Sequence, residues 1–387
     1  MKKIALFGAT GSVGTSTLDI VRAYPEQFKI SVLTAHSKTD DLAKLALEFQ
    51  PDYVVISNEG CLEELRSHLS DFRGAILAGS DGLDEAACFD GYDLMVTGIV
   101  GFAGLKSLMK AIETGHDIAF ANKECLVCAG PLVMGAVKKH GVKFLPIDSE
   151  HNAIFQVLDN KQKESITRLI LTASGGPFRE KRWADLNAIT PQQAVAHPNW
   201  SMGAKISVDS ATMMNKGLEI IEAHHLFDIP VDKIRAVLHP QSAVHSFVEY
   251  DDGSLLAQVG PADMKTPIIF ALGYPQRLKT PGKRLDLLSS RHDFSFYPIE
   301  KGHFPLFDRA QEALTSGLEA TTVLNSANEV SVGAFLNNQI EYQQILDCVD
   351  FALDNIANEN IETLDNVFEI DYKTRIQVKN YIKHKSS

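Results

Sequence analysis

The first 150 residues alternate short apolar runs with segments of helical periodicity. The apolar runs at 3–7, 30–34 and 53–57 are bounded by glycine, proline or polar residues, as buried strands are. The same pattern predicts further strands at 74–78, 93–97, 117–121 and 142–147, and helices at 16–23, 39–49 and 59–69. Strands that alternate with helices usually form a parallel sheet, so the pattern predicts an α/β domain.

The remainder of the chain changes character twice. Short strand patterns come first, and Asp251 to Gly253 is typical of a hairpin turn between two of them. These strands are predicted at 167–172, 236–238, 242–250 and 254–259. They indicate a partly antiparallel sheet, which is a candidate oligomer surface. A proline-rich stretch at 273–305 then resembles a linker. Helical patterns follow at 306–316, 319–336, 341–356 and 372–384.

Composition narrows the class of protein. The 387 residues carry a net charge of −12, which argues against general binding to nucleic acid or to anionic membranes. No apolar run approaches the roughly 20 residues that span a bilayer. The initial apolar run stops at Gly8, too early for a signal peptide, and five scattered cysteines suit a reducing compartment. We therefore expect a cytoplasmic protein.

Histidines and cysteines form no clear metal-binding pattern. Cys125 and Cys128 make a lone CxxC, without a second pair or ligand histidines at zinc spacing. We interpret them as small residues of a helix rather than as a metal or redox site. His239 and His245 also lack partners at metal-ligand spacing, so structural roles are favoured for both.

A glycine-rich turn follows the first predicted strand. Gly8, Gly11 and Gly14 lie between that strand and a helix, which is the context of a dinucleotide-binding turn. Glycine allows the backbone to approach a pyrophosphate, whose charge the helix N-terminus favours. The alternative is a tight turn that binds nothing. After the second strand no acid occurs before Asp40, whereas Ser37 and Lys38 could hold a 2′-phosphate, which favours NADP over NAD.

One stretch, residues 197–223, concentrates polar side chains. Its first half is predicted to be a loop, and its second half a helix with Asp209 or Ser210 as the N-cap. Asn215, Lys216 and Glu219 then share one side of that helix. This set suits an anionic, oxygen-rich ligand, although a solvated helix face is the alternative.

Acidic residues after the last strand of the first domain suggest a metal site. Asp148 and Glu150 are two positions apart, so on extended backbone they face the same side. Two such carboxylates favour a hard divalent cation between them, and Glu219 is available as a third. Exposed acidic pairs are common, which is the alternative interpretation.

Two more polar segments follow predicted strands. Lys123 and Glu124 come after the strand at 117–121, where open α/β sheets bind ligands. Ser174-Gly175-Gly176 could cradle an anion with backbone N–H groups. A surface helix start and an ordinary loop are the respective alternatives.

Six motifs occur in an order that resembles the 1-deoxy-D-xylulose 5-phosphate reductoisomerase family. They are Gly8–Gly14, Ala121–Glu124, Pro146–Glu150, Ala173–Phe178, His197–Met202 and Asp209–Glu219. The resemblance covers essentially the whole chain, including His239–Ser242 and the helical tail. It implies conversion of 1-deoxy-D-xylulose 5-phosphate to 2-C-methyl-D-erythritol 4-phosphate, on the non-mevalonate isoprenoid route, by a homodimer that uses NADPH and Mg²⁺ or Mn²⁺.

The resemblance also implies residue roles, taken motif by motif. The implied metal ligands are Asp148, Glu150 and Glu219, which with Lys123 form the catalytic set. The implied substrate contacts are Lys123, Ser149, Glu150, Ser174, His197, Trp200, Met202, Ser210, Asn215, Lys216 and Glu219. The cofactor contacts are Gly8, Thr10, Gly11, Ser12, Val13, Ser37, Lys38, Asn122, Glu124 and Gly203. The chain departs from the family pattern at His36, commonly glycine, and at Ala204, often basic.

Pattern and resemblance together predict an α/β fold with three domains and a linker. These are an amino-terminal Rossmann-like NADPH-binding domain at 1–147, a central α+β catalytic and dimerisation domain at 148–272, a linker at 273–300 and a carboxy-terminal helical bundle at 301–387. A flap at about 195–204 is expected to cover the substrate. Two other classes stay open: a semialdehyde dehydrogenase with Cys125 or Cys128 as nucleophile, and a non-catalytic NADP-binding sensor.

Overall fold

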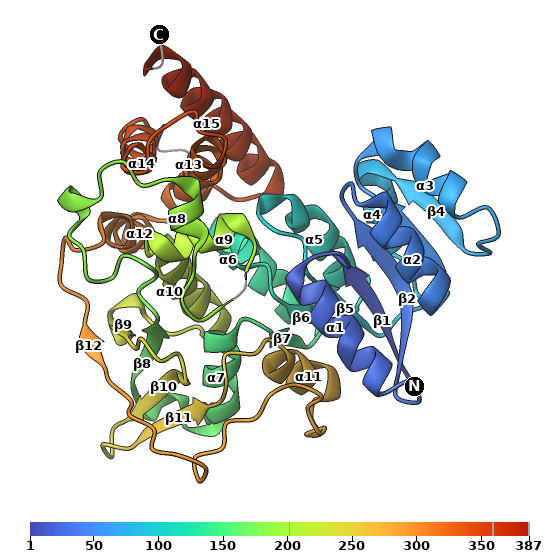
Figure 1. The fold of residues 1–387 in the computed structure, drawn as a ribbon, viewed down its shortest axis with the longest axis horizontal. Coiled ribbons are helices and arrows are strands. Elements are labelled where there is room, and N and C mark those ends of the chain that lie inside the picture. Colours follow the sequence, from blue (N-terminus) through green and yellow to red (C-terminus); the bar gives the residue numbers. More distant parts are fainter. Residues whose placement is uncertain (201, 358–359, 386–387) are drawn as a thin grey trace. The chain divides into compact units, whose positions relative to one another are not determined.

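The computed structural model describes residues 1–200, 202–357 and 360–385 (Figure 1). The chain divides into two compact units that each draw on separated segments. The first unit comprises residues 1–122, 135–152 and 263–283. The second comprises residues 123–134, 153–262 and 284–387.

The first unit is built on a parallel sheet of seven strands. In sheet order the strands are β4 (Ala75–Ala78), β3 (Tyr53–Ile56), β2 (Phe28–Ala35), β1 (Lys2–Phe7), β5 (Leu94–Thr97), β6 (Asp117–Phe120) and β7 (Phe144–Pro146). Every neighbouring pair is parallel. β1 and β2 are almost entirely buried, which explains why they read as continuous apolar runs. The predicted Rossmann-like α/β fold class is confirmed.

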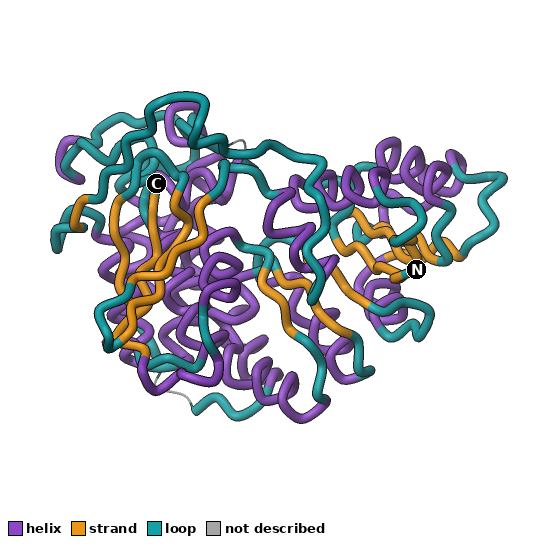
Figure 2. The backbone as a smooth tube through the Cα atoms, turned by 90° about the horizontal axis from the view of Figure 1, so that it is seen from below, coloured by secondary structure: helices purple, strands orange, loops and turns teal. Residues whose placement is uncertain are grey.

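Helices connect the strands of this sheet (Figure 2). They are α1 (Ser12–Ala23), α2 (Thr39–Phe49), η1 (Glu59–Cys61), α3 (Leu62–His68), α4 (Gly79–Ala87), η2 (Phe102–Gly104) and α5 (Leu105–Glu113). Helix α1 begins four residues earlier than predicted, directly after Gly11. Helix α4 was not predicted; it contains Gly79 and Gly82, and glycine has a low helix propensity. α11 (Lys265–Gly273) was also missed and packs against α1.

A second sheet organises the second unit. Its order is β11 (Leu255–Val259), β10 (Val244–Tyr250), β8 (Ile166–Ala173), β9 (Ile234–Leu238) and β12 (Tyr297–Pro298). β8 and β9 are parallel, whereas β10 is antiparallel to both β8 and β11. The hairpin between β10 and β11 turns at Gly253, whose φ is +84°. The partly antiparallel sheet is therefore confirmed, but β12 falls in the segment predicted to be a linker.

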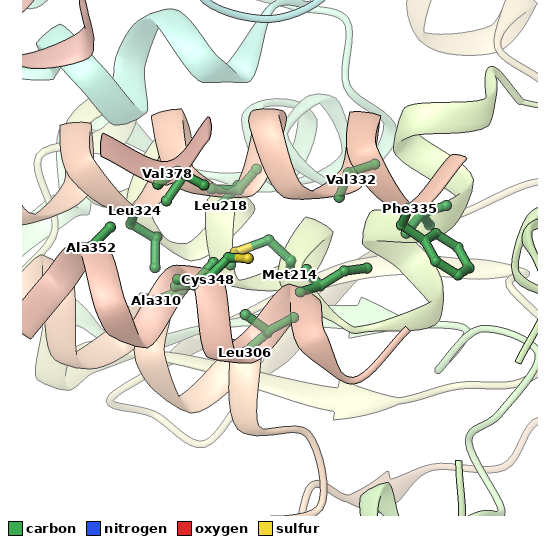
Figure 3. Close-up of a cluster of buried hydrophobic side chains, with 14 of the residues drawn as sticks. Met214, Leu218, Leu306, Ala310, Leu324, Val332, Phe335, Cys348, Ala352 and Val378 are labelled. Atoms are coloured by element: carbon green, nitrogen blue, oxygen red, sulfur yellow. The ribbon is translucent and has the colours of Figure 1, made fainter. Parts of the chain in front are cut away.

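Helices pack around one apolar cluster of the second unit (Figure 3). These helices are α9 (Ala204–Ala211), α10 (Met214–Phe227), α12 (Pro305–Ser316), α13 (Leu318–Leu336), α14 (Gln344–Asp354) and α15 (Leu364–Lys385). Met214 and Leu218 of α10 meet Leu306 of α12, Leu324 of α13 and Val378 of α15 in this cluster. The helical bundle is thus anchored to α10, the helix that carries the central polar stretch.

Two predictions about local structure near that stretch were wrong. Residues after Gly203 were expected to form a loop up to about residue 209, but α9 already begins at Ala204. The N-cap of α10 is Met213, with φ +62°, and neither Asp209 nor Ser210. Asp209 lies inside α9 instead, where its side chain is 1% exposed.

The smaller elements of the second unit complete the connections. They are η3 (Asn160–Ser165), η4 (Trp183–Asp185), α8 (Pro191–Val195) and η5 (Val231–Lys233). Helices α6 (Lys123–His140) and α7 (Ser149–Val157) contribute residues to both units. Among the helices of the described residues, none is long and apolar enough to cross a membrane.

Candidate active site

The glycine-rich turn of the first unit brings backbone against backbone. Gly8 has φ +93°, and a Cβ on it would lie 2.5 Å from the carbonyl carbon of Gly98. A Cβ on Gly14 would lie 2.4 Å from the oxygen atoms of Gly8 and Ala9. Gly11 is the N-cap of α1, so no N-cap side chain occupies the N–H groups of the first turn. A helix N-terminus reached through such a turn suits a pyrophosphate. Thr10, Ser12 and Val13 line the same turn.

The residues predicted to bind a 2′-phosphate follow the carboxyl end of β2. His36, Ser37 and Lys38 are exposed, and Lys38 is the N-cap of α2. The Nδ1 atom of His36 lies 2.9 Å from Oγ of Ser57. His36 stands where the family pattern commonly has glycine, and the hydroxyl of Ser37 and the ammonium of Lys38 next to it face solvent.

Asn122 ends the stretch after β6 and is the N-cap of α6. Its Nδ2 donates to the carbonyl of Gly101 at 2.9 Å, and the residue is 2% exposed. A Cβ on Gly104 would lie 2.4 Å from Nδ2, so Gly104 leaves the space that the amide fills. Asn122 thereby connects the carboxyl end of β6 to the loop after β5.

Asp148 and Glu150 do not lie on extended backbone, so that geometric argument was wrong. Asp148 directly precedes α7, and Glu150 is in its first turn. The Glu150 N–H donates to Oδ1 of Asp148 at 3.3 Å, and Ser149 Oγ donates to Oε2 of Glu150 at 2.8 Å. Nδ1 of the buried His151 lies 3.4 Å from Oδ1 of Asp148. A helix N-terminus favours such carboxylates electrostatically.

Glu219 is the centre of a buried polar cluster in the second unit. Its Oε1 accepts from Lys123 Nζ at 3.0 Å and from Asn215 Nδ2 at 2.6 Å. Lys216 Nζ contacts Oε2, and Lys123 also donates to Asn215 Oδ1 at 3.0 Å. Glu219 is 1% exposed, Lys216 3% and Lys123 5%. The predicted shared face of α10 is confirmed, and two ammonium groups around one carboxylate suit a further anion.

A second charged cluster lies beside the first. Lys205 Nζ contacts Glu124 Oε1 at 2.6 Å and Asp209 Oδ2 at 2.9 Å. Asn328 Nδ2 donates to Asp209 Oδ1 at 2.8 Å. Burial opposes charge on Lys205, but Asp209 and Glu124 raise its pKa above the ordinary value. Burial likewise opposes charge on Glu124, but Lys205 and then Lys123 hold its pKa below the ordinary value.

Sequence reasoning missed Lys205, Asp209 and Asn328 as members of this region. Lys205 and Asp209 are four residues apart, which would have indicated an ion pair if α9 had been recognised. Their partners Glu124 and Asn328 are remote in sequence, and no local signal connects them.

Ser174 and His197 belong to a third group of hydrogen-bonded residues in the second unit. Nδ1 of His197 accepts from the N–H groups of Asn199 at 3.2 Å and Trp200 at 2.9 Å. The ring proton must therefore be on Nε2, which lies 2.9 Å from Ser174 Oγ and donates to it. Burial lowers the pKa of His197 to about 4, in keeping with a neutral ring. Gly176 N–H also donates to Ser174 Oγ, at 3.2 Å.

The same turn lies against the end of α9. Gly176 has φ +65°, and a Cβ on it would lie 2.6 Å from the carbonyl oxygen of Ser210. Ser210 itself is half-buried. Since both bonds to Ser174 Oγ use it as an acceptor, its hydroxyl proton is left to donate to a ligand. Ser174 and Ser210 are thereby brought to one place.

The predicted flap is attached to the sheet of the second unit. Asn199 Nδ2 donates to the carbonyl of Pro240 at 2.6 Å and to Ser242 Oγ at 2.9 Å. The Trp200 ring meets the His245 ring edge-on, with 6.2 Å between centroids. Met202 is half-buried and Gly203 is the exposed N-cap of α9. Residue 201, within the predicted flap, lies outside the described residues.

The cysteine pair and the two histidines have structural surroundings. Cys125 and Cys128 are buried in α6, as predicted, and burial raises the pKa of both thiols well above 9. A thiolate nucleophile needs the opposite shift. Nε2 of His239 accepts from the N–H groups of Ala243 and Val244, at 3.1 Å each. These contacts support a structural role for His239.

The first unit has a doubly wound parallel sheet with a glycine turn, and the second unit has a buried, cation-rich polar cluster. These two features define a dinucleotide-binding α/β protein with an anion site. Family models described as 1-deoxy-D-xylulose 5-phosphate reductoisomerase match residues 4–130, and models of its C-terminal domains match residues 144–227 and 259–377. The chain belongs to the 1-deoxy-D-xylulose 5-phosphate reductoisomerase family.

Individual relatives agree over nearly the full length. The 1-deoxy-D-xylulose 5-phosphate reductoisomerase of Chlorobaculum tepidum is 49% identical over 350 residues, covering 90% of this chain and 91% of the relative. A solved reductoisomerase in complex with NADPH, fosmidomycin and magnesium is 42% identical, with a TM-score of 0.95 over 99% of this chain and 98% of that one. The Zymomonas mobilis enzyme in complex with NADPH is 42% identical, with a TM-score of 0.91 and coverage of 98% and 99%.

Proposed function

We infer that this chain is the NADPH- and divalent-metal-dependent enzyme that isomerises and reduces 1-deoxy-D-xylulose 5-phosphate to 2-C-methyl-D-erythritol 4-phosphate, a precursor step of the non-mevalonate isoprenoid route. Near-complete coverage by reductoisomerase relatives supports the reaction. The observation that carries the site is the burial of Glu219 between the ammonium groups of Lys123 and Lys216.

We propose Asp148, Glu150 and Glu219 as ligands of Mg²⁺ or Mn²⁺. All three donate carboxylate oxygen, the donor that hard divalent ions prefer. Asp148 and Glu150 are half-buried at the start of α7, and Glu219 is buried against Lys123 and Lys216. The donor set therefore fits the magnesium that relatives bind. Bound there, the metal would act as a Lewis acid on the substrate oxygens.

NADPH fits the turn of the first unit. Gly8, Gly11 and Gly14 keep the backbone open toward a pyrophosphate, and Thr10, Ser12 and Val13 would contact it. The exposed Ser37 and Lys38 would take the 2′-phosphate. Asn122, Glu124 and Gly203 are proposed as further cofactor contacts. The bound cofactor would supply the hydride for the reduction.

The substrate phosphate is assigned to the second unit. Lys216 supplies an ammonium, and Asn215 an amide. Ser174 and Ser210 supply hydroxyl groups at the turn that His197 closes. Holding a dianion in a buried, cation-rich place contributes binding free energy far from the reacting carbons. That free energy can order the flap residues Trp200 and Met202 over the substrate and exclude water.

The remaining proposed contacts hold the substrate backbone. Glu219 and Asn215 hold the Lys123 ammonium in place, and we propose that it also contacts a substrate oxygen. Ser149 and Glu150 would contact the hydroxyl groups of the substrate. A positively charged Lys123 also stabilises negative charge that develops on the substrate during rearrangement.

We propose a homodimer formed through the β11 edge of the second sheet, where Leu255, Leu256 and Val259 are 42–54% exposed. We also propose a cytoplasmic location, with no nucleic-acid or membrane partner. The domain boundaries at residues 147, 272 and 300 remain predictions.

The test is oxidation of NADPH by the purified chain with 1-deoxy-D-xylulose 5-phosphate and Mg²⁺ or Mn²⁺. We expect loss of the nicotinamide absorbance that stops with EDTA and falls sharply when NADH replaces NADPH. Turnover that persists in EDTA would contradict the metal assignment. Equal rates with NADH would contradict the roles of Ser37 and Lys38. Silence in a folded, NADPH-binding protein would favour the sensor.

A further inference from the structure

We propose that Lys205 is a positioning residue for the cofactor: it clamps Glu124 of α6 to the first turn of α9, so that Glu124 and Gly203 meet NADPH as one preformed pair. The inference rests on the proposed function, in which Glu124 and Gly203 contact the cofactor. Neither motif spacing nor the family resemblance assigned a role to Lys205.

The ammonium of Lys205 is in direct contact with two carboxylates, and the three side chains are largely shielded from water. The ammonium of Lys205 lies 2.6 Å from Glu124 Oε1 and 2.9 Å from Asp209 Oδ2. The side chains of Lys205, Glu124 and Asp209 are 18%, 9% and 1% exposed. Charge pairs so shielded from water have fixed geometry, in contrast to mobile surface pairs.

The clamp connects two segments that are distant in sequence. Gly203 is the N-cap of α9, and its carbonyl accepts from the N–H of Ser207 at 3.1 Å and from Ser207 Oγ at 2.9 Å. Lys205 lies two residues after this cap. Its bond to Glu124 therefore fixes the start of α9 to the start of α6, which holds both proposed cofactor contacts.

The far side of the clamp is also fixed. Asp209 accepts from Nδ2 of Asn328, a residue of α13 that is fully buried. Lys205 is thus held at a defined place by Asp209 and is not free to follow Glu124 if that carboxylate moves. The rigid member is α9, and the member that is positioned is Glu124.

Lys123 is a second cation close to Glu124 and competes with Lys205 for its carboxylate. Lys123 directly precedes Glu124, and its charge also acts on that carboxylate. Lys123 also donates hydrogen bonds to Glu219 and Asn215. Without Lys205, the carboxylate of Glu124 would turn toward Lys123 and away from the cofactor. Lys205 therefore keeps the cofactor contact and the substrate cluster separate.

The experiment compares Asp209→Asn with the double variant Lys205→Met/Asp209→Asn. Asparagine still accepts from Asn328, and the double variant leaves no unpaired charge on α9. Glu124 of α6 keeps Lys123 as a neighbouring cation, so both variants are expected to fold. NADPH affinity is measured by nicotinamide fluorescence and the KM values by turnover. We expect the double variant to bind NADPH about tenfold more weakly than Asp209→Asn, since residues that orient a ligand contact have effects of this size. The KM for the sugar phosphate should change by less than about threefold.

Arg309→Met is the matched control, because Arg309 also pairs with two carboxylates, Asp350 and Glu312. It should leave NADPH affinity unchanged. If the double variant does not fold, Lys205→Arg replaces it: the larger guanidinium displaces the charge, and about threefold weaker NADPH binding is expected. The proposal is overturned if the double variant binds NADPH within about twofold of Asp209→Asn. Where Lys205→Arg is used instead, it is overturned if that variant binds NADPH within about twofold of wild type. A wild-type chain that binds NADPH without turnover contradicts the proposed function instead, and the binding comparison still decides the role of Lys205.

Discussion

Glu219 has almost no exposure to water and is surrounded by donors from α6 and α10. Replacing it with glutamine keeps the shape and one acceptor but removes the charge that a divalent cation requires. We expect Glu219→Gln to lower turnover by at least about a hundredfold, as loss of electrostatic stabilisation does. NADPH binding, assayed by fluorescence, should remain near normal. Retained metal-dependent turnover would refute the ligand assignment.

The buried thiols distinguish this enzyme from one that uses a cysteine nucleophile. Cys125 and Cys128 are both inaccessible, and burial keeps both thiols protonated. We expect Cys125→Ser and Cys128→Ser to retain kcat within about twofold, with a stability cost of about 1 kcal/mol from the buried hydroxyl. Steady-state assays and thermal unfolding measure the two effects. Abolished turnover in a stable variant would revive the dehydrogenase alternative.

Buried histidines make stability depend on pH. Burial lowers the pKa of His197, His225 and His245 to about 4. The unfolded chain binds the same protons near pH 6.5, so between pH 6.5 and 4 it holds more protons than the folded chain. Stability is therefore highest above pH 6.5 and falls as the pH drops through this window.

His245, which is 5% exposed, allows the effect to be isolated. Urea unfolding at pH 7 and pH 5 should show that His245→Gln loses about 1–2 kcal/mol less than wild type over this interval. The exposed His140 is the control, and His140→Gln should lose as much as wild type. An equal loss in His245→Gln and wild type would show that His245 does not titrate in this way.

Single elements decide whether the cofactor can bind. A Cβ at Gly14 would lie 2.4 Å from two backbone oxygens, so Gly14→Ala must push α1 away from the turn after β1. We expect NADPH binding to weaken by at least about tenfold, because the pyrophosphate depends on that close approach. Fluorescence titration measures it.

Gly135 provides the matching control for that glycine. It lies within α6, and a Cβ there would meet nothing within 4 Å. Gly135→Ala should leave NADPH affinity unchanged and raise stability by up to about 1 kcal/mol through helix propensity. If both substitutions weakened binding equally, the turn would not be the cofactor site.

Elements whose signals are local were predictable. Strands β1 to β3 are buried runs between clear breakers, and α10 places Lys216 and Glu219 together by helical spacing alone. Pro198 and Gly203 concealed the start of α9, and the Asp-x-Glu spacing concealed that Glu150 lies in the first turn of a helix. The pair between Lys205 and Glu124 could not be predicted, because only the folded second unit brings these residues together.

Assembly is argued at the scale of the whole molecule. Leu255 and Leu256 on edge strand β11 are 54% and 47% exposed, and edge strands with apolar side chains favour association. We expect the wild type to elute with twice the mass of one chain in light scattering coupled to size exclusion. Leu256→Glu should shift it toward the monomer, because a second copy would bury that charge.

Leu47 is the control for that surface, since it is 49% exposed on α2 of the first unit. Leu47→Glu should leave the mass unchanged. A dimer that survives Leu256→Glu would place the interface elsewhere on the chain.

The two edges of the second sheet are unequal, and this limits stoichiometry. At one edge β12 contains only Tyr297 and Pro298, which pair with Leu238 and Val237 of β9. Proline has no N–H to offer a further strand, so that edge cannot propagate a ladder. In the proposed dimer, twofold symmetry uses the β11 edge of both copies at once. The joined sheet of the dimer would then end on both sides in β12, the strand that contains Pro298. Association through sheet edges would therefore stop at two chains.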